Sequence, residues 1–131
     1  MKLRIIHKID HGNGITESHS DIGMVIWKKN GLRHRDNDEY AVRYIDGSCE
    51  WWQKGKMHRE GKPAVVVPFY REEWWKKGKK HRDDGPAVLL SNGTEEYWHE
   101  GIKITEQEFN AIYLNNNLPN QNIVNRKKLK L

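Results

Sequence analysis

Two stretches of the chain decide the fold: Trp52-Gln53-Lys54-Gly55-Lys56-Met57-His58-Arg59-Glu60-Gly61-Lys62-Pro63-Ala64-Val65 and Trp75-Lys76-Lys77-Gly78-Lys79-Lys80-His81-Arg82-Asp83-Asp84-Gly85-Pro86-Ala87-Val88. They carry Trp, Gly, His, Arg, Pro, Ala and Val at equal offsets, with a period of 23 residues. A period of about 20–50 residues is the signature of a repeat protein, in which each unit packs on its neighbours. The sequence therefore predicts a repeat architecture.

Further copies of the pattern lie on both sides of these stretches. An earlier copy, with one residue inserted between its His and its Ala, consists of Trp27, Gly31, His34, Arg35, Asp36, Ala41 and Val42. Trp98 and Gly101 open a last, truncated copy. The fragment His19–Val25 keeps a His, an acid and a Gly at the offsets of His81, Asp83 and Gly85.

Each unit has the features of a β-hairpin. Short runs rich in β-branched residues, typical of strands, occur at Ala41–Ile45, Ala64–Val67 and Ala87–Leu90. Asp46-Gly47 and Asn92-Gly93 follow two of these runs and favour type I′ turns. Returning strands are expected at Glu50–Trp52, Glu73–Trp75 and Glu96–Trp98, each ending at a second turn. We expect a mainly β fold, a single elongated antiparallel sheet of hairpin repeats with a short C-terminal capping helix.

Strand pleating divides the aromatic residues between two faces, because adjacent residues in a strand point in opposite directions. We expect one column of Trp27, Trp52, Trp75 and Trp98 and a second of Ile26, Trp51, Trp74 and Tyr97. The first column is interpreted as core. If Trp51 and Trp74 are exposed, they form a surface of the kind that marks a binding site.

The ends of the repeat array have the features of caps. Thr105-Glu106-Gln107-Glu108 has the form of a capping box, and Phe109, Ile112 and Tyr113 follow on one helix face. We expect residues 1–114 to form the repeat domain, with repeats at about 19–104 and the helix at about 105–114. This helix and a strand within Lys2–Ile9 would cover the two sheet edges. Residues 115–131 are expected to be a polar linker and a basic tail.

Composition limits the classes of function. The chain has 131 residues with a net charge of +5, 31% charged residues and one cysteine, Cys49. A single cysteine excludes an internal disulfide framework. No apolar stretch approaches the roughly 20 residues of a membrane span, and the N-terminus lacks the features of a signal peptide, so we expect a cytoplasmic protein. We expect no cofactor, and the oligomeric state stays open.

The repeated His-Arg-acid group has two interpretations. Its residue types suit general acid–base chemistry. Because the group recurs once per repeat, whereas an active site needs one singular arrangement, we favour a structural role: His and acid bind backbone groups of the turn, and Arg stacks on Trp or pairs with the acid. Successive histidines lie about 10 Å apart by the strand spacing, too far to share one metal ion. We expect no catalytic residue, no metal site and no enzyme activity.

The repeats break their own pattern at one hairpin tip. Pro68-Phe69-Tyr70-Arg71 stands where the neighbouring copies have Asp-Gly and Asn-Gly, and we expect a longer loop there with outward-pointing aromatics. Phe69 and Tyr70 either fold back over the sheet or anchor a partner, since Tyr and Arg are frequent interface hot spots. A second irregularity, the acidic segment Arg35–Tyr40, is expected to be a solvated loop.

The Trp-x-x-Gly-x-x-His pattern resembles the MORN (membrane occupation and recognition nexus) repeat. This resemblance implies a stack of hairpins in an elongated, curved sheet, and it covers about residues 19–114. The variant with Arg after His and with Gly-Pro-Ala at 85–87 resembles repeats in small proteins of tailed phages and large DNA viruses. It implies a scaffold for a protein partner. It further suggests an accessory protein that binds and inhibits a host factor such as a defence complex. The irregular tip and the second aromatic column give the candidate partner-binding residues, which are Phe69, Tyr70, Arg71, Trp51 and Trp74.

The alternative is a module that binds RNA or DNA. Its candidate residues are a basic cluster, the two tryptophans Trp51 and Trp74 and the basic tail; the cluster is Lys76, Lys77, Lys79, Lys80 and Arg82. Cations beside stacking aromatics are the usual means of binding single strands. The positive net charge argues against mimicry of DNA.

Overall fold

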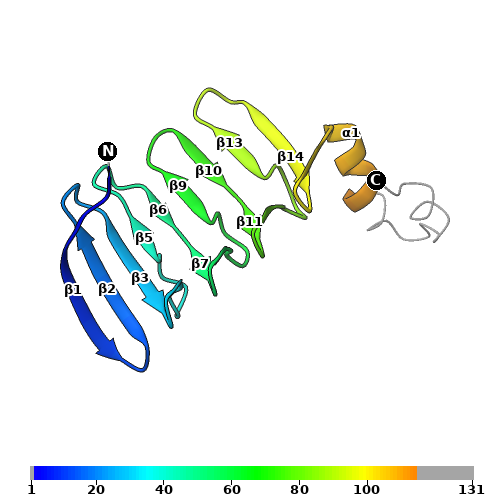
Figure 1. Ribbon diagram of the computed structural model, residues 1–131. Helices are drawn as coiled ribbons and strands as arrows, with labels where there is room; N and C mark the ends of the chain where they lie inside the picture. The colour runs from blue at the N-terminus through cyan, green and yellow to red at the C-terminus, as the bar shows by residue number, and fades with distance from the viewer. Residues whose placement is uncertain (1, 115–131) are drawn as a thin grey trace.

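The computed structural model describes residues 2–114, and the expected linker and tail at 115–131 lie outside them. The described part is mainly β, with 44% of its residues in strands and 8% in helices. Most strands belong to one antiparallel sheet that extends hairpin by hairpin along the molecule (Figure 1). This architecture confirms the expected fold class.

The sheet grows from the N-terminal strands to the C-terminal helix. Its path is β1-β2-β3-β5-β6-β9-β10-β13-β14-β15, with β4 beside β3. The bounds are β1 Ile5–Gly12, β2 Ile15–Ser20, β3 Val25–Lys29, β4 Leu32–Arg33, β5 Val42–Arg43, β6 Cys49–Glu50, β9 Val65–Val67, β10 Arg71–Glu73, β13 Val88–Leu90, β14 Glu95–His99 and β15 Ile102–Ile104. Two small ribbons, β7 (Trp52–Gln53) with β8 (Lys56–Met57) and β11 (Trp75–Lys76) with β12 (Lys79–Lys80), extend the hairpins on one side.

The core is thin and made of small residues at repeated positions. Ala41, Ala64 and Ala87 are completely buried. Each accepts a backbone hydrogen bond from an aromatic residue of the preceding unit, as when the Trp51 N–H donates to the Ala64 carbonyl at 2.8 Å. The repeat period thus fixes the packing of each hairpin on the next.

The two ends of each hairpin use different turns from those expected. At the tips, positive φ occurs at Gly47 and Gly93 but not at Asp46 or Asn92, so these are not type I′ turns. They are three-residue loops in which Asp46 Oδ1 accepts from the Ser48 N–H at 2.8 Å. With this side-chain bond, Asp46 keeps a negative φ. The expectation of type I′ tips was wrong.

Type I′ geometry lies at the opposite ends of the hairpins. Five turns there have two consecutive residues with positive φ: Asn13-Gly14, Asn30-Gly31, Lys54-Gly55, Lys77-Gly78 and Glu100-Gly101. The first centre of such a turn favours Asn or Asp, yet three of these turns carry Lys or Glu there. A compensating interaction is therefore needed at those three positions.

The aromatic columns also differ from those expected. Trp27 belongs with Trp51 and Trp74, because each donates its backbone N–H to the next buried alanine and accepts from the N–H of the repeat histidine. Trp27 lies four residues before its glycine, as Trp51 does, whereas Trp52 lies three before. Ile26 accordingly takes the place of Glu50 and is buried in a small cluster with Met24 and Val42.

The other column consists of indoles anchored by carboxylates. Trp52, Trp75 and Trp98 each donate Nε1–H to a glutamate two residues earlier, at 2.9, 2.8 and 3.0 Å. The acceptors are Glu50, Glu73 and Glu96. Each glutamate faces the same side of the sheet as its tryptophan, because the two residues are two positions apart in the strand. These tryptophans are half-buried rather than completely enclosed.

A helical segment ends the array. The expected capping box is confirmed: the Glu108 N–H donates to Thr105 Oγ1, and the Thr105 N–H donates to Glu108 Oε1. The helix α1 (Glu106–Phe109) continues as a π-helical turn, η1 (Asn110–Leu114). Phe109 is buried against Tyr97, with ring centroids 4.8 Å apart. None of the helices within residues 2–114 has the length and hydropathy to cross a bilayer.

Candidate functional site

The repeated histidines join each unit to the next turn. The Nδ1 atoms of His34, His58 and His81 accept the backbone N–H of Lys54, Lys77 and Glu100 at 3.0, 2.9 and 2.9 Å. These donors are the first centres of the type I′ turns, at φ values of 47–49°. The histidine bond is therefore the compensation that allows Lys or Glu in this conformation.

The other ring nitrogen of each histidine contacts the acid of its own motif. His34 Nε2 lies 2.8 Å from Asp36, His58 Nε2 lies 3.0 Å from Glu60, and His81 Nε2 lies 2.5 Å from Asp83. Because Nδ1 accepts a hydrogen bond, the proton of the neutral ring is on Nε2 and is donated to the carboxylate. This bond to His34 lowers the pKa of Asp36 below its ordinary value.

The repeated arginines cover the first tryptophan column. The guanidinium carbons of Arg35, Arg59 and Arg82 lie 4.0, 3.8 and 3.9 Å from the ring centroids of Trp27, Trp51 and Trp74. Each also donates Nη1–H to a backbone carbonyl, those of Tyr40, Pro63 and Pro86. Stacking with a fixed hydrogen bond is a geometry that arginine, not lysine, provides.

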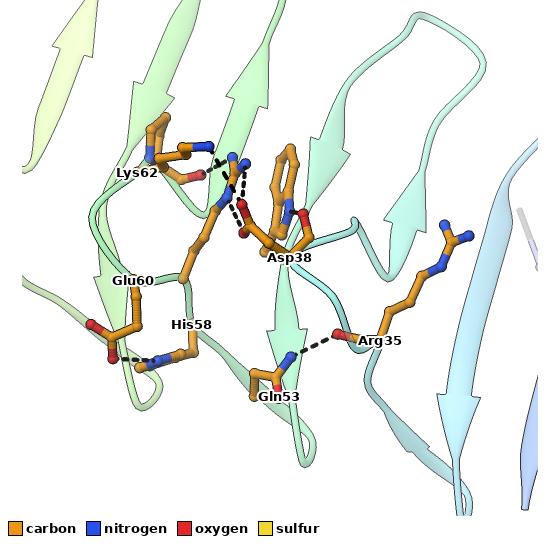
Figure 2. A network of polar contacts seen from close by, with 9 residues as sticks. Arg35, Asp38, Gln53, His58, Glu60 and Lys62 are labelled. Atoms are coloured by element: carbon orange, nitrogen blue, oxygen red, sulfur yellow. Dashed lines mark hydrogen bonds and ion pairs between the residues drawn. The ribbon is translucent and has the colours of Figure 1, made fainter.

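Figure 2 shows how the acidic segment of the first copy reaches the next repeat. Arg59 donates Nε–H to Asp38 Oδ1 at 2.8 Å and Nη2–H to Oδ2 at 3.2 Å, and the Trp51 indole donates to the Asp38 carbonyl at 3.1 Å. Lys62 adds an ion pair to the same carboxylate at 3.5 Å. The Arg59 hydrogen bond lowers the pKa of Asp38. The expectation of a merely solvated loop was wrong, because Asp38 bridges two repeats.

The sequences of the copies explain why Arg59 pairs with an aspartate of the preceding copy. In the third copy, Arg82 pairs with its own Asp84 at 2.9 Å. The second copy has Gly61 at the corresponding position, so Arg59 takes Asp38 from the preceding unit. The His-Arg-acid groups are thus used within and between repeats. The histidines bind backbone groups of the turns and the arginines stack on tryptophans, as expected, whereas the acids contact His Nε2 and not the backbone of the turn.

The fragment at His19 does not reproduce this arrangement. His19 Nε2 contacts Glu17 at 2.7 Å, and Asp21 instead pairs with Arg4 at 3.7 Å. At the other end, Ile104 occupies the histidine position of the truncated copy and is buried. Within residues 2–114 no further type I′ turn follows that could donate an N–H to a histidine at this position.

Some of the candidate aromatic and basic residues are engaged in contacts within the repeats, whereas others line an open depression. Trp51 and Trp74 are half-buried beneath their arginines, so their ring faces are not free platforms. Arg82 is held by Trp74 and Asp84, and Lys80 lies over Trp98 at 4.7 Å. The other three lysines of the cluster line an open depression at the type I′ turns, together with one further lysine; the four are Lys56, Lys76, Lys77 and Lys79.

The hairpin tip of β9 and β10 lies at the opposite edge from these lysines. Its loop has three residues between the paired Val67 and Arg71, the same length as the other tips, so the expected longer loop is absent. The expected outward direction of its aromatics is confirmed, since Phe69 is 93% exposed and Tyr70 69%. Pro68 precedes Phe69, and the Tyr70 N–H donates to the Val67 carbonyl at 3.0 Å.

The backbone of Phe69 is strained. Its φ is +68°, in the left-handed region. Seven other non-glycine residues of the described chain have positive φ; four are Asn or Asp, and three are the turn residues held by histidines. Phe69 belongs to neither group. For an ordinary L-residue this conformation costs roughly 1–2 kcal/mol.

The tip is held in place by its neighbours. The Ser91 N–H donates to the Tyr70 carbonyl at 2.9 Å, and Arg71 Nε lies 2.8 Å from Glu73 Oε2. The next tip along the edge presents Ile45, which is 80% exposed, and beyond it Ile22 is 47% exposed. Sequence reasoning missed both, although each immediately precedes a turn residue at the same edge of the sheet.

Comparison of the chain with protein-family models, with curated proteins and with solved structures finds no match.

Proposed function

We propose that this chain is a non-catalytic repeat scaffold that binds a protein partner through the Pro68–Arg71 tip. The observation that carries this proposal is Phe69, an apolar ring that is 93% exposed on a strained backbone. Such a residue contributes nothing to the core and costs stability. Strain of this kind persists where the surroundings impose it, and it clusters at functional sites.

The surroundings of Phe69 suit a protein-binding anchor. Tyr70 and Arg71 flank it, and both residue types are frequent among interface hot spots. The tip is tied to the next hairpin, so little conformational entropy is lost when a partner binds. The partner we infer has an apolar pocket for the Phe69 ring. By resemblance to viral repeat proteins, this partner is a host factor that the scaffold blocks.

Trp51 and Trp74 contribute indirectly in this proposal. Covered by Arg59 and Arg82, they stiffen the sheet that presents the tip. They are on successive repeats, so each stack reinforces one junction. A partner that contacted them would first have to displace a guanidinium group.

The test compares the intact chain with Phe69→Asn and with Ile102→Asn as the matched control. Asparagine tolerates positive φ, so Phe69→Asn removes the ring without disturbing the loop. Ile102 is 60% exposed on β15, away from the tips. Proteins captured from host lysate by the intact chain are identified, purified and titrated with all three forms.

A hot-spot role predicts an affinity loss of about 30-fold for Phe69→Asn, equivalent to about 2 kcal/mol. The Ile102→Asn variant should bind as the intact chain does. Equal affinity of Phe69→Asn and the intact chain for every captured protein would rule out the tip as the site.

The nucleic-acid alternative is favoured by one observation, the four lysines that line the depression at the turns. None of them has an ion pair within residues 2–114. Against it, the indoles that would stack bases are covered by arginines. Titration of a fluorescent single-stranded oligonucleotide at rising salt tests this function, because phosphate binding weakens steeply with salt. Binding absent at low salt excludes it.

A further inference from the structure

The two ends of the sheet are closed differently. At the C-terminal end, the next strand after β14 and β15 would begin near residue 110 by the 23-residue period, and the chain is helical there instead. At the N-terminal end, β1 is the outermost strand, and within residues 2–114 no strand pairs with its outer edge (Figure 1). The array therefore stops growing at one end and has an open strand edge at the other.

The open strand is long and exposed. β1 spans eight residues, and all but Ile9 are exposed. It contains no proline, and Ile5 and Ile6 are 43% and 62% exposed. An unpaired strand edge of this length is a template for pairing with another strand, unless charges or irregularities prevent it.

We propose that β1 pairs antiparallel with β1 of a second copy of this chain, forming a symmetric dimer with one continuous sheet. This inference is independent of the proposed partner-binding tip. Irregularities in the pairing of β1 with β2 lie between Ile5 and His7 and between Asp10 and Gly12. They leave a regular stretch, His7–Asp10, which contains the centre of the new pairing.

Symmetry restricts the register of this pairing. A two-fold axis between two antiparallel edge strands is perpendicular to the sheet, so every side chain stays on its own face. The axis must then pass through a residue that lies opposite itself. Through Ile9, it places Lys8 opposite Asp10 of the second copy and Asp10 opposite Lys8 of the second copy.

Charge selects this register over its neighbours. Moving the axis to Lys8 places two lysines opposite each other, and moving it to Asp10 places two aspartates opposite each other. Opposite charges stabilise a cross-strand pair, whereas like charges destabilise it. Within residues 2–114, neither Lys8 nor Asp10 has an ion pair, although Asp10 accepts the Gly12 N–H at 2.9 Å. Both charges are therefore available to a second copy.

The paired run is short, about five residues from each copy, so the interface is smaller than the roughly 1,200 Å² of a stable complex. We expect a reversible dimer with a dissociation constant between about 1 μM and 1 mM. Sedimentation equilibrium of the purified full chain over this concentration range measures it. A monomer at every concentration would overturn the proposal.

Charge variants test the register. Lys8→Asp and Asp10→Lys should each weaken the dimer at least tenfold, because each replaces two attractions by two repulsions. The double variant Lys8→Asp/Asp10→Lys should restore it. Lys54→Asp, the same charge change on an exposed turn, is the control and should have no effect. Circular dichroism checks that each variant is folded, and dimerisation unchanged by both single variants contradicts this interface.

A cross-link gives a second, independent readout. Opposite Cα atoms in an antiparallel pair are about 4.5–5.5 Å apart, within the range of a disulfide. In a Cys49→Ser background, Ile9→Cys should oxidise to a covalent dimer. Lys8→Cys should not, because the two copies of residue 8 are displaced along the strands. Equal cross-linking at both positions would overturn the register.

Discussion

His58 Nδ1 lies 2.9 Å from the backbone nitrogen of Lys77, in the turn of the following repeat. The bond joins residues of two successive units that are 19 positions apart in sequence, and it recurs at His34 with Lys54 and at His81 with Glu100. A histidine that looks catalytic by residue type is thus part of the connection between repeats. Its ring is also fixed as one tautomer by Glu60.

Replacing this histidine should weaken the fold without any other effect. His58→Ala is expected to lower the free energy of unfolding by about 1 kcal/mol, the usual net value of one hydrogen bond. His34→Ala should cost more, because His34 is buried and its partner N–H has less access to water. Urea unfolding measures both, with the exposed His7→Ala as control. A loss at His7 as large as that at His58 would contradict the junction role.

The stacking of Arg59 on Trp51 predicts that a positive charge at position 59 is not sufficient for full stability. Arg59→Lys keeps the positive charge but loses the planar contact with Trp51 and the two-bond contact with Asp38. We expect a decrease of about 1 kcal/mol in the free energy of unfolding. Arg43→Lys, at an exposed position, should leave it unchanged within about 0.5 kcal/mol. Equal effects of the two substitutions would show that stacking is unimportant.

Acid should weaken the junction formed by Asp38. Its pKa is lowered in the folded chain, chiefly by the Arg59 hydrogen bond, while in the unfolded chain it has the ordinary value of about 3.9. The carboxylate therefore contributes stability above the unfolded pKa, and this contribution is lost as pH falls through the folded pKa.

Asp38→Asn should make the unfolding midpoint less dependent on pH below about 5, measured by urea titration at successive pH values. Glu72→Gln, an exposed carboxyl on β10 for which no ion pair is found within residues 2–114, is the control. An unchanged acid slope in Asp38→Asn would show that Asp38 is not one of the groups responsible.

Removing the most exposed aromatic ring should not destabilise the protein. Phe69→Gly relieves the left-handed backbone, so the free energy of unfolding should stay constant or rise by up to about 1 kcal/mol. Phe109→Ala, at a buried position, should lower it by about 3 kcal/mol. Thermal unfolding of both variants provides the measurement. A marked loss from Phe69→Gly would mean that the ring stabilises the tip.

Much of the fold could be predicted because the same residue types recur at the same positions of each repeat. The glycine of each second turn, the buried alanine and the capping box at Thr105 all had a direct sequence signal. The position of Trp27 had one too: its distance to Gly31 matches that of Trp51 to Gly55. The tip turns were mispredicted because Asp46 bonds to Ser48, which a dipeptide preference does not include.

The sequence by itself determined the hairpin period, the turn positions and the residue types at each junction, because these depend on local backbone conformation and side-chain volume. The tertiary structure decided which groups meet across repeats: Asp38 with Arg59, His58 with Lys77, and Arg82 over Trp74. It also decided that the Phe69 side chain is exposed and that β1 is an edge strand of the sheet formed by residues 2–114. Contacts between units depend on how strands stack and twist in space, and no local pattern specifies that arrangement.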